Sequence, residues 1–210
     1  MKLNNKRTIL VGLAFLSICA FWQMYDSIVP LILTKTFHMN ETFSGAIMAA
    51  DNILALFLLP FFGSVSDKSH SKLGKRMPFI LFGTGCAIIL MNILPLLDNS
   101  YAAQPSGFKT ASFVIVLGLL LVAMGTYRAP AVALMPDVTP KPLRSRANAI
   151  INLMGAVGGI LYLGVAAVLY PNSKTAGLDH VNYQPLFIVV SAIMLSLIHI
   201  SEPTRRTPIS

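Results

Sequence analysis

Six apolar segments, each about as long as the hydrocarbon core of a lipid bilayer is thick, account for most of the 210-residue chain. A helix needs roughly 20 mostly apolar residues to cross that core. The segments that reach or approach this length are 8–33, 43–65, 78–97, 111–135, 147–170 and 185–200, of which the last is short. Because the connections between them are also short, neighbouring helices should run antiparallel. The pattern predicts an all-α membrane protein with six transmembrane helices.

The composition agrees with a chain that is surrounded by membrane lipid. Of its residues, 55% are hydrophobic and 11% are charged, whereas soluble domains carry about 25% charged residues. The net charge of +8 does not predict nucleic-acid binding, because the basic residues lie in loops between apolar segments, where they orient a membrane protein. Cys19 and Cys86 lie within apolar segments and no Cys/His spacing suits a metal, so we expect no disulfide, metal site or cofactor.

The distribution of Lys and Arg predicts the orientation of the chain. The N-terminus and the second–third and fourth–fifth loops hold ten of these residues, and the opposite loops hold three, Lys35, Lys109 and Lys174. Basic loops stay in the cytoplasm. The sequence therefore predicts a multi-pass protein of the cell membrane with a cytoplasmic N-terminus. The opposite loops, including 99–101, are expected to be solvent-facing turns.

The loop after the second segment, Gly63 to Phe79, reads GSVSDKSHSKLGKRMPF. Its distinctive residues are Gly63, Asp67, Lys68, Gly74, Lys75 and Arg76. This spacing resembles the signature between the second and third helices of major facilitator transporters. The end of this loop, Gly-Lys-Arg-Met-Pro-Phe, resembles the corresponding segment of the glycoside–pentoside–hexuronide:cation symporters and their sucrose-transporter-like relatives. The glycine would let two helices approach closely and the acid could pair with a neighbouring Arg; the alternative is an ordinary positive-inside loop.

The fourth–fifth junction, residues 133–148, carries a second resemblance to the same symporter group. A helix end, a Pro-Asp turn, a basic run and an Ala-Asn pair follow one another. We expect Asp137 to pair with Arg144, Arg146 or the basic loop after Gly63. On this hypothesis Asp67 and Asp137 help to lock a cytoplasmic gate; the alternative is that both are solvated loop charges.

The resemblance implies that residues 1–200 form the N-terminal six-helix half of such a transporter, truncated and lacking its C-terminal half. The tail 201–210 resembles non-native sequence and is left out of the fold prediction. The implied activity is secondary active uptake of a small polar solute, a sugar or glycoside, with a cation by alternating access. No metalloprotease or nucleophile-elbow motif indicates an enzyme. The alternative is a non-transporting six-helix module or an inactive fragment.

Charged groups within a membrane segment are costly and are therefore functional candidates. Asp26 lies about 10 Å from the outer end of the first segment at 1.5 Å per residue. Trp22, Gln23 and Pro30 are spaced three and four residues from it and are expected to share its face. A carboxylate, an amide and an indole ring together suit a sugar, which presents hydroxyl groups and an apolar CH face. The alternative is a polar residue near the outer interface.

Asp51 and Asn52 lie in the second segment at nearly the depth of Asp26. Two carboxylates at one level can share a proton or hold a cation, because both cannot stay ionised there. The alternative is that Asp51 caps the outer turn of its helix. In melibiose-type relatives, carboxylates that bind sodium occupy the positions of Ala55 and Leu59. Their absence here favours a proton over sodium as the coupling cation.

Arg128 lies about 9 Å from the inner end of the fourth segment. It resembles the fourth-helix arginine of many proton-coupled major facilitator transporters. In a straight helix this depth places it too far inward to pair with Asp26 or Asp51. The alternative is that its guanidinium extends to the cytoplasmic interface.

The fifth segment contains Gly155, Gly158, Gly159 and Gly164, a pattern that predicts close packing against another helix. Asn152, in the same segment, is a further candidate to line the cavity.

Overall fold

The computed structural model describes residues 5–69 and 76–201, and this part of the chain contains helices and no β-strand. The elements in chain order are α1 (Asn5–Leu31), the π-helix η1 (Ile32–Thr36), α2 (Glu41–Lys68), α3 (Met77–Ala103), α4 (Gly107–Val138), the 3₁₀-helix η2 (Lys141–Leu143), α5 (Arg144–Leu169), the short α6 (Asn172–Thr175) and α7 (Gln184–Ser201). The prediction of an all-α protein is confirmed.

Helix lengths fit a polytopic membrane protein. Five helical segments, formed by α1 to α5 with η1 and η2, are long and apolar enough to cross a bilayer, and the apolar part of α7, Gln184–Ser196, is shorter. α3 does not end at Leu97 but continues to Ala103. The expected turn at 99–101 is therefore wrong; this segment is helical and follows Asp98, which is fully buried.

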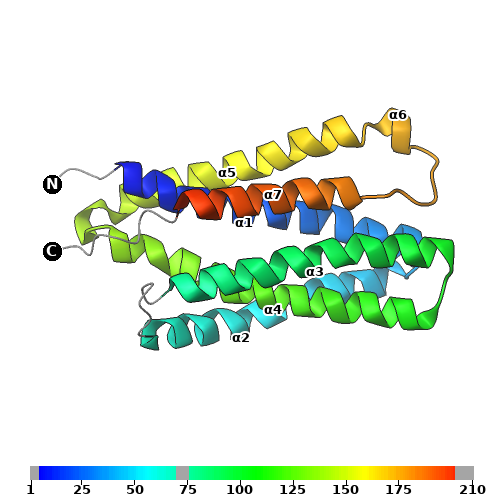
Figure 1. Cartoon of the computed structure of the whole chain (residues 1–210), viewed down its shortest axis with the longest axis horizontal. Coiled ribbons are helices and arrows are strands. Elements are labelled where there is room, and N and C mark those ends of the chain that lie inside the picture. The colour runs from blue at the N-terminus through cyan, green and yellow to red at the C-terminus, as the bar shows by residue number, and fades with distance from the viewer. Residues whose placement is uncertain (1–4, 70–75, 202–210) are drawn as a thin grey trace.

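The six long helices lie side by side, with α2 and α5 at opposite edges of the bundle (Figure 1). The start of α1 and the end of α7 lie at one end, together with the end of α2, the start of α3 and the α4–α5 junction (Figure 1). We call this end the terminus side and the opposite end, which carries α6, the α6 side. This arrangement leaves α2 largely uncovered, with Phe43, Leu56 and Phe57 among its exposed side chains.

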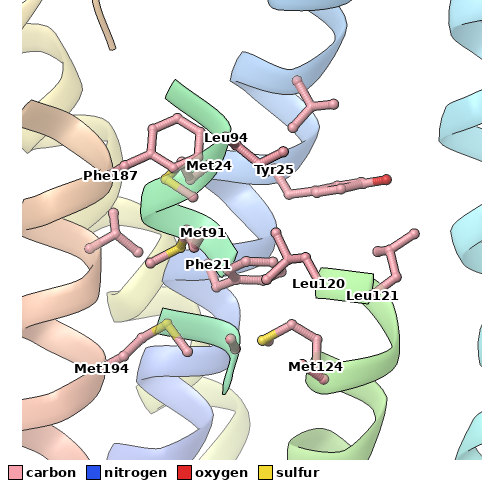
Figure 2. Close-up of a cluster of buried hydrophobic side chains, with 14 of the residues drawn as sticks. Phe21, Met24, Tyr25, Met91, Leu94, Leu120, Leu121, Met124, Phe187 and Met194 are labelled. Carbon is pink, nitrogen blue, oxygen red and sulfur yellow. The ribbon is translucent and has the colours of Figure 1, made fainter. Parts of the chain in front are cut away.

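The core forms around α1, which packs against α5, α7 and α4. Apolar side chains from four helices meet there (Figure 2). They include Phe21, Met24 and Tyr25 of α1, Met91 and Leu94 of α3, Leu120, Leu121 and Met124 of α4, and Phe187 and Met194 of α7. Their burial fixes the positions of α1 and α4, the two helices that supply most of the candidate site.

Glycines allow two helix pairs to approach closely. A Cβ added at Gly158 of α5 would overlap the carbonyl oxygen of Leu16 and lie 2.9 Å from its carbonyl carbon. A Cβ at Gly83 of α3 would lie 2.8 Å from the backbone nitrogen of Tyr127. Near the second contact, the Tyr127 hydroxyl donates to the carbonyl oxygen of Ala14 at 3.1 Å and lies 2.6 Å from Ser17 Oγ. These contacts join α1, α3, α4 and α5 at short range.

Candidate functional site

A small pocket between α1, α2 and α4, which we call the central pocket, contains the polar side chains Trp22, Asp51 and Arg128. Aliphatic residues complete its lining: Leu54, Ala55, Leu58, Leu59, Leu121 and Gly125. The Arg128 guanidinium carbon lies 5.4 Å from the centre of the Trp22 ring, a cation–π distance. The structure thus brings together three of the seven residues predicted to form the substrate or coupling site.

Arg128 forms no ion pair with Asp26 or Asp51 among the described residues, and its side chain lies within the bundle. Arg128 lines the same pocket as Asp51 and lies over the Trp22 ring instead of extending to the end of the helix. A straight-helix estimate places only the Cα atom, whereas the arginine side chain is long enough to reach a partner at another level. The guanidinium therefore supplies a permanent positive charge to the central pocket, over the Trp22 ring.

Several buried polar atoms around the central pocket lack a hydrogen-bond partner among the described residues. They are Asp51 Oδ1, Trp22 Nε1 and the Tyr25 hydroxyl. Buried polar groups are satisfied in most native structures, so each such group calls for an explanation. An acceptor, an N–H donor and a hydroxyl near one pocket can together bind a hydroxylated solute. Sequence reasoning missed Tyr25, although its position next to Asp26 was a usable signal.

The other four predicted residues do not line this pocket. Asp26 is exposed, and it is close enough to Asp51 for the two carboxylates to repel each other. Gln23 Oε1 approaches Gly159 of α5, at 3.7 Å from where a Cβ would lie. Because a helix turns about 100° per residue, Trp22 and Gln23 flank Asp26 on its two sides, one facing α4 and the other facing α5. The three residues lie within an arc of about 100° on α1, so the face that they share contacts two neighbouring helices. Asn52 and Asn152 are exposed on α2 and α5.

Asp67 and Arg76, two residues of the predicted gate, form an ion pair on the terminus side. The Arg76 Nη2 and Asp67 Oδ1 atoms are 2.8 Å apart, with Asp67 mostly exposed and Arg76 mostly covered. The pair connects the last turn of α2 to the start of α3. Lys68 ends α2, while Gly74, Lys75 and the side chain of Asp137 lie outside the described residues.

One expectation for the gate needs correction, whereas the pairing expected for Asp137 lies outside the described residues. A Cβ at Gly63 would meet no atom within 4 Å, so this glycine does not permit a close helix contact within the described chain, because its side of α2 is uncovered. Arg144 donates to the carbonyl oxygens of Pro136, at 3.0 Å, and Thr139, at 3.4 Å. It thereby ties the end of α4 to the start of α5. Arg146 is exposed.

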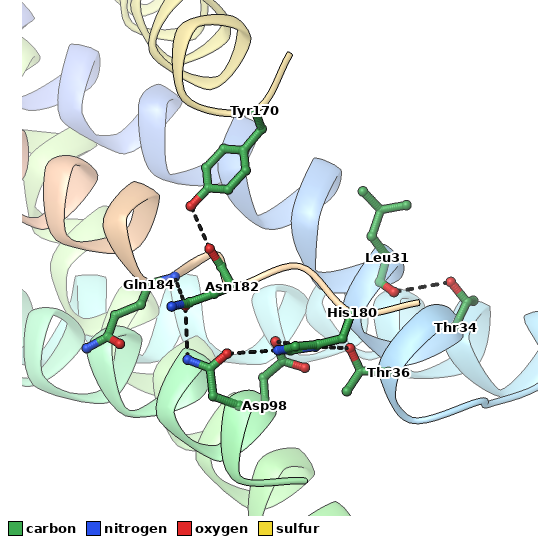
Figure 3. Close-up of polar contacts among 9 residues, drawn as sticks. Leu31, Thr34, Thr36, Asp98, Tyr170, His180, Asn182 and Gln184 are labelled. Atoms are coloured by element: carbon green, nitrogen blue, oxygen red, sulfur yellow. Dashed lines mark hydrogen bonds and ion pairs between the residues drawn. The ribbon is translucent and has the colours of Figure 1, made fainter. Parts of the chain in front are cut away.

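A polar network on the α6 side was not predicted from the sequence (Figure 3). His180 Nε2 lies 2.9 Å from Asn99 Oδ1 and therefore donates to it, since an amide oxygen only accepts. His180 Nδ1 lies 3.2 Å from Thr36 Oγ1 and 3.9 Å from Asp98 Oδ2. Asn99 Nδ2 donates to Asn182 Oδ1 at 2.9 Å, and the Tyr170 hydroxyl donates to the Asn182 carbonyl at 2.7 Å. The network fixes the connection between α6 and α7 onto η1 and α3.

Comparison with known proteins places these features in a family. The profile of the Major Facilitator Superfamily matches residues 11–208. A sucrose transport protein of Arabidopsis thaliana is 35% identical over 158 residues, which cover 70% of this chain and 26% of that protein. A sucrose transport protein of Oryza sativa subsp. indica is 36% identical over 154 residues, covering 67% and 30%. The alpha-ketoglutarate permease of Escherichia coli (strain K12) is 24% identical over 201 residues, covering 93% and 43%.

The matched region is less than half of the length of each of these relatives. All three are named as transport proteins or permeases. The resemblance read from the two basic junctions is therefore confirmed.

Proposed function

The chain belongs to the Major Facilitator Superfamily, and from this premise we propose that it forms one half of a secondary active transporter for a sugar or glycoside. The observation that carries the proposal is the central pocket, in which Trp22, Asp51 and Arg128 converge from three helices. The pocket has a volume of about 20 Å³, which holds about one water molecule, so a sugar enters it only in a more open state. In that state the indole ring packs on the apolar face of the sugar ring, while the carboxylate and guanidinium bind hydroxyl groups. The two sucrose transport proteins among the relatives support this class of solute.

A proton is the coupling cation that the pocket favours. Ala55 and Leu59 occupy the positions of the sodium-binding carboxylates in melibiose-type relatives, and both line the central pocket as apolar residues. Asp51 is then the carboxylate of the pocket that carries the proton, and Arg128 lines the same pocket. Asp26, which is exposed and repelled by Asp51, is a second carrier on the same path.

The uncovered helices indicate where a second six-helix half would dock. α2 has no buried residue within its most apolar window, and α5 exposes Leu153, Ile160 and Leu163. A second half in contact with α2 and α5 would enclose the central pocket between the two halves, as alternating access requires. Because basic junctions stay in the cytoplasm, the terminus side faces the cytoplasm and the α6 side faces outward, with the cell membrane as the site of action.

Uptake of labelled solutes tests the proposed function. Cells that produce the two-half transporter should accumulate labelled sucrose when a proton gradient is present, and a protonophore should abolish the accumulation. Labelled alpha-ketoglutarate serves as the competing solute, since Arg128 could also bind a carboxylate. Accumulation of alpha-ketoglutarate without sucrose would replace the sugar by an organic acid, and accumulation of neither would support a non-transporting module.

The Asp67–Arg76 pair predicts a measurable effect on the gate. Asp67→Lys places a positive charge beside Arg76, so we expect a severalfold shift toward the inward-open state, in line with loss of about 1 kcal/mol from an exposed pair. Alkylation of a cysteine introduced at Ser66 reports cytoplasmic access. Arg76→Asp in the same protein should restore part of the original balance. An unchanged alkylation rate in Asp67→Lys would remove this pair from the gate.

A further inference from the structure

A second cavity lies on the α6 side, between α1, α5 and α7, with a volume of about 370 Å³. Its polar lining comes from Ser27, Tyr162, Tyr170, Thr175 and Tyr183, and the rest is aliphatic. It shares no lining residue with the central pocket. The volume is within the range of small-molecule sites. We propose that this cavity, which we call the outer cavity, binds one ring of a small carbohydrate separately from the central pocket.

Tyr162 points to a ligand in the outer cavity. Its side chain is 1% exposed, and its hydroxyl is buried with no hydrogen-bond partner among the described residues. Ser27, which also lines the cavity, donates to the carbonyl oxygen of Gln23 at 2.6 Å. A buried hydroxyl with no partner is unfavourable unless a ligand or a water satisfies it. A hydroxyl group of a sugar would satisfy Tyr162 as donor or acceptor.

The rim of the outer cavity is aromatic and remains protonated. The Tyr170 and Tyr183 rings lie 5.2 Å apart at 48°, which presents ring faces to a sugar's CH surface. Burial raises the pKa of both hydroxyls, and the negative charge of Asp98 raises the pKa of Tyr183 further. Tyr183 therefore stays a neutral hydrogen-bond donor at physiological pH, while the Tyr170 hydroxyl already donates to the Asn182 carbonyl.

The outer cavity is preformed, because its wall is held by the network of Figure 3. Tyr170 donates to Asn182, and Asn182 in turn receives a bond from Asn99 of α3. His180 ties the same connection to Thr36. A wall that is already ordered lowers the entropic cost of binding.

A neighbouring cavity shows why a sugar, and not a lipid chain, fits the outer cavity. On the opposite side of α5, a groove against Val189 of α7 is lined by Ile160, Leu161, Gly164, Val165, Val168 and Leu169. That lining has no polar side chain and suits an acyl chain. The outer cavity contains the buried and unpartnered hydroxyl of Tyr162, which an acyl chain would leave unsatisfied. The class of ligand rests on the proposed function, whereas the cavity and its unpartnered hydroxyl do not.

Cysteine protection tests the inference on the 210-residue chain in lipid nanodiscs. In a Cys19→Ala/Cys86→Ala background, Thr175→Cys lies in the cavity wall, while Ser173→Cys lies on the same short helix but outside the lining. Sucrose should slow the reaction of Thr175→Cys with a water-soluble maleimide severalfold and leave Ser173→Cys unchanged. Mannitol at the same concentration controls for osmotic effects. Tyr162→Phe removes one hydroxyl, so the sucrose concentration for half-protection should rise about fivefold, with no change in the rate without sugar.

Three results would overturn the inference: equal rates with and without sucrose, equal protection of the two cysteines, or a Thr175→Cys rate that responds to phospholipid and not to sucrose. The last result would assign the cavity to lipid. Ala167→Phe, which places a larger side chain in the outer cavity, should remove the protection by sucrose.

The uptake experiment separates this inference from the proposed function. Uptake without protection refutes only the outer cavity, protection without uptake refutes only sugar transport, and the absence of both refutes both.

Discussion

Gly158→Ala is expected to destabilise the chain by about 3 kcal/mol, near the upper end of what overpacking costs. The added methyl group would overlap the carbonyl oxygen of Leu16 and lie 3.0 Å from its Cα atom. These are backbone atoms of α1, so no side chain can rotate away and the two helices must separate. α1 packs more extensively on α5 than on any other helix among the described residues. Unfolding by SDS, followed by circular dichroism, measures the change.

Gly164→Ala is the matched control on the same helix. No atom lies within 4 Å of a Cβ at Gly164, so the stability should stay the same or rise slightly through the higher helix propensity of alanine. Equal destabilisation by the two substitutions would show that the effect does not come from the contact between α1 and α5.

The sequence predicts the helices well because hydropathy reports directly on which segments lie in lipid. It predicts the helix contacts less well. Of the four glycines in the predicted packing pattern of α5, Gly155 and Gly158 contact α1 closely, Gly159 is at ordinary contact distance and Gly164 faces open space. All four have the same sequence signal. Which of them meets a neighbour depends on the rotation of α5 about its axis, and spacing alone does not give that rotation.

The candidate site shows the same limit. Trp22, Asp51 and Arg128 were each identified as polar residues within apolar segments, but their convergence depends on side-chain reach. Asp98 was missed because it directly follows an apolar segment and was assigned to a loop. The structure buries it within α3, 3.9 Å from His180. The partner comes from a connection 82 residues later in the chain, so no local pattern could have indicated the pair.

Asp51→Asn is expected to abolish proton-driven accumulation of sucrose, by about 100-fold or more if the carboxylate carries the proton. Asparagine keeps the size of the side chain and its hydrogen-bonding capacity but cannot be protonated. Exchange of labelled for unlabelled sucrose across the membrane, which needs no net proton movement, should therefore continue. A variant that loses both accumulation and exchange would indicate that Asp51 binds the solute or supports the fold.

Arg128→Gln separates binding from coupling. Since Trp22 is the one tryptophan of the chain and lies against Arg128, its fluorescence reports solute binding in the central pocket. Arg128→Gln should weaken the sucrose response of Trp22 and reduce exchange about tenfold or more, as expected for loss of a charged hydrogen bond. Ile89→Ala, on the exposed face of α3, should change neither the fluorescence response nor the exchange.

If Asp51 and Arg128 act as one unit, the variant with both Asp51→Asn and Arg128→Gln will transport no worse than Asp51→Asn alone. Additive losses would show two independent roles within the same pocket.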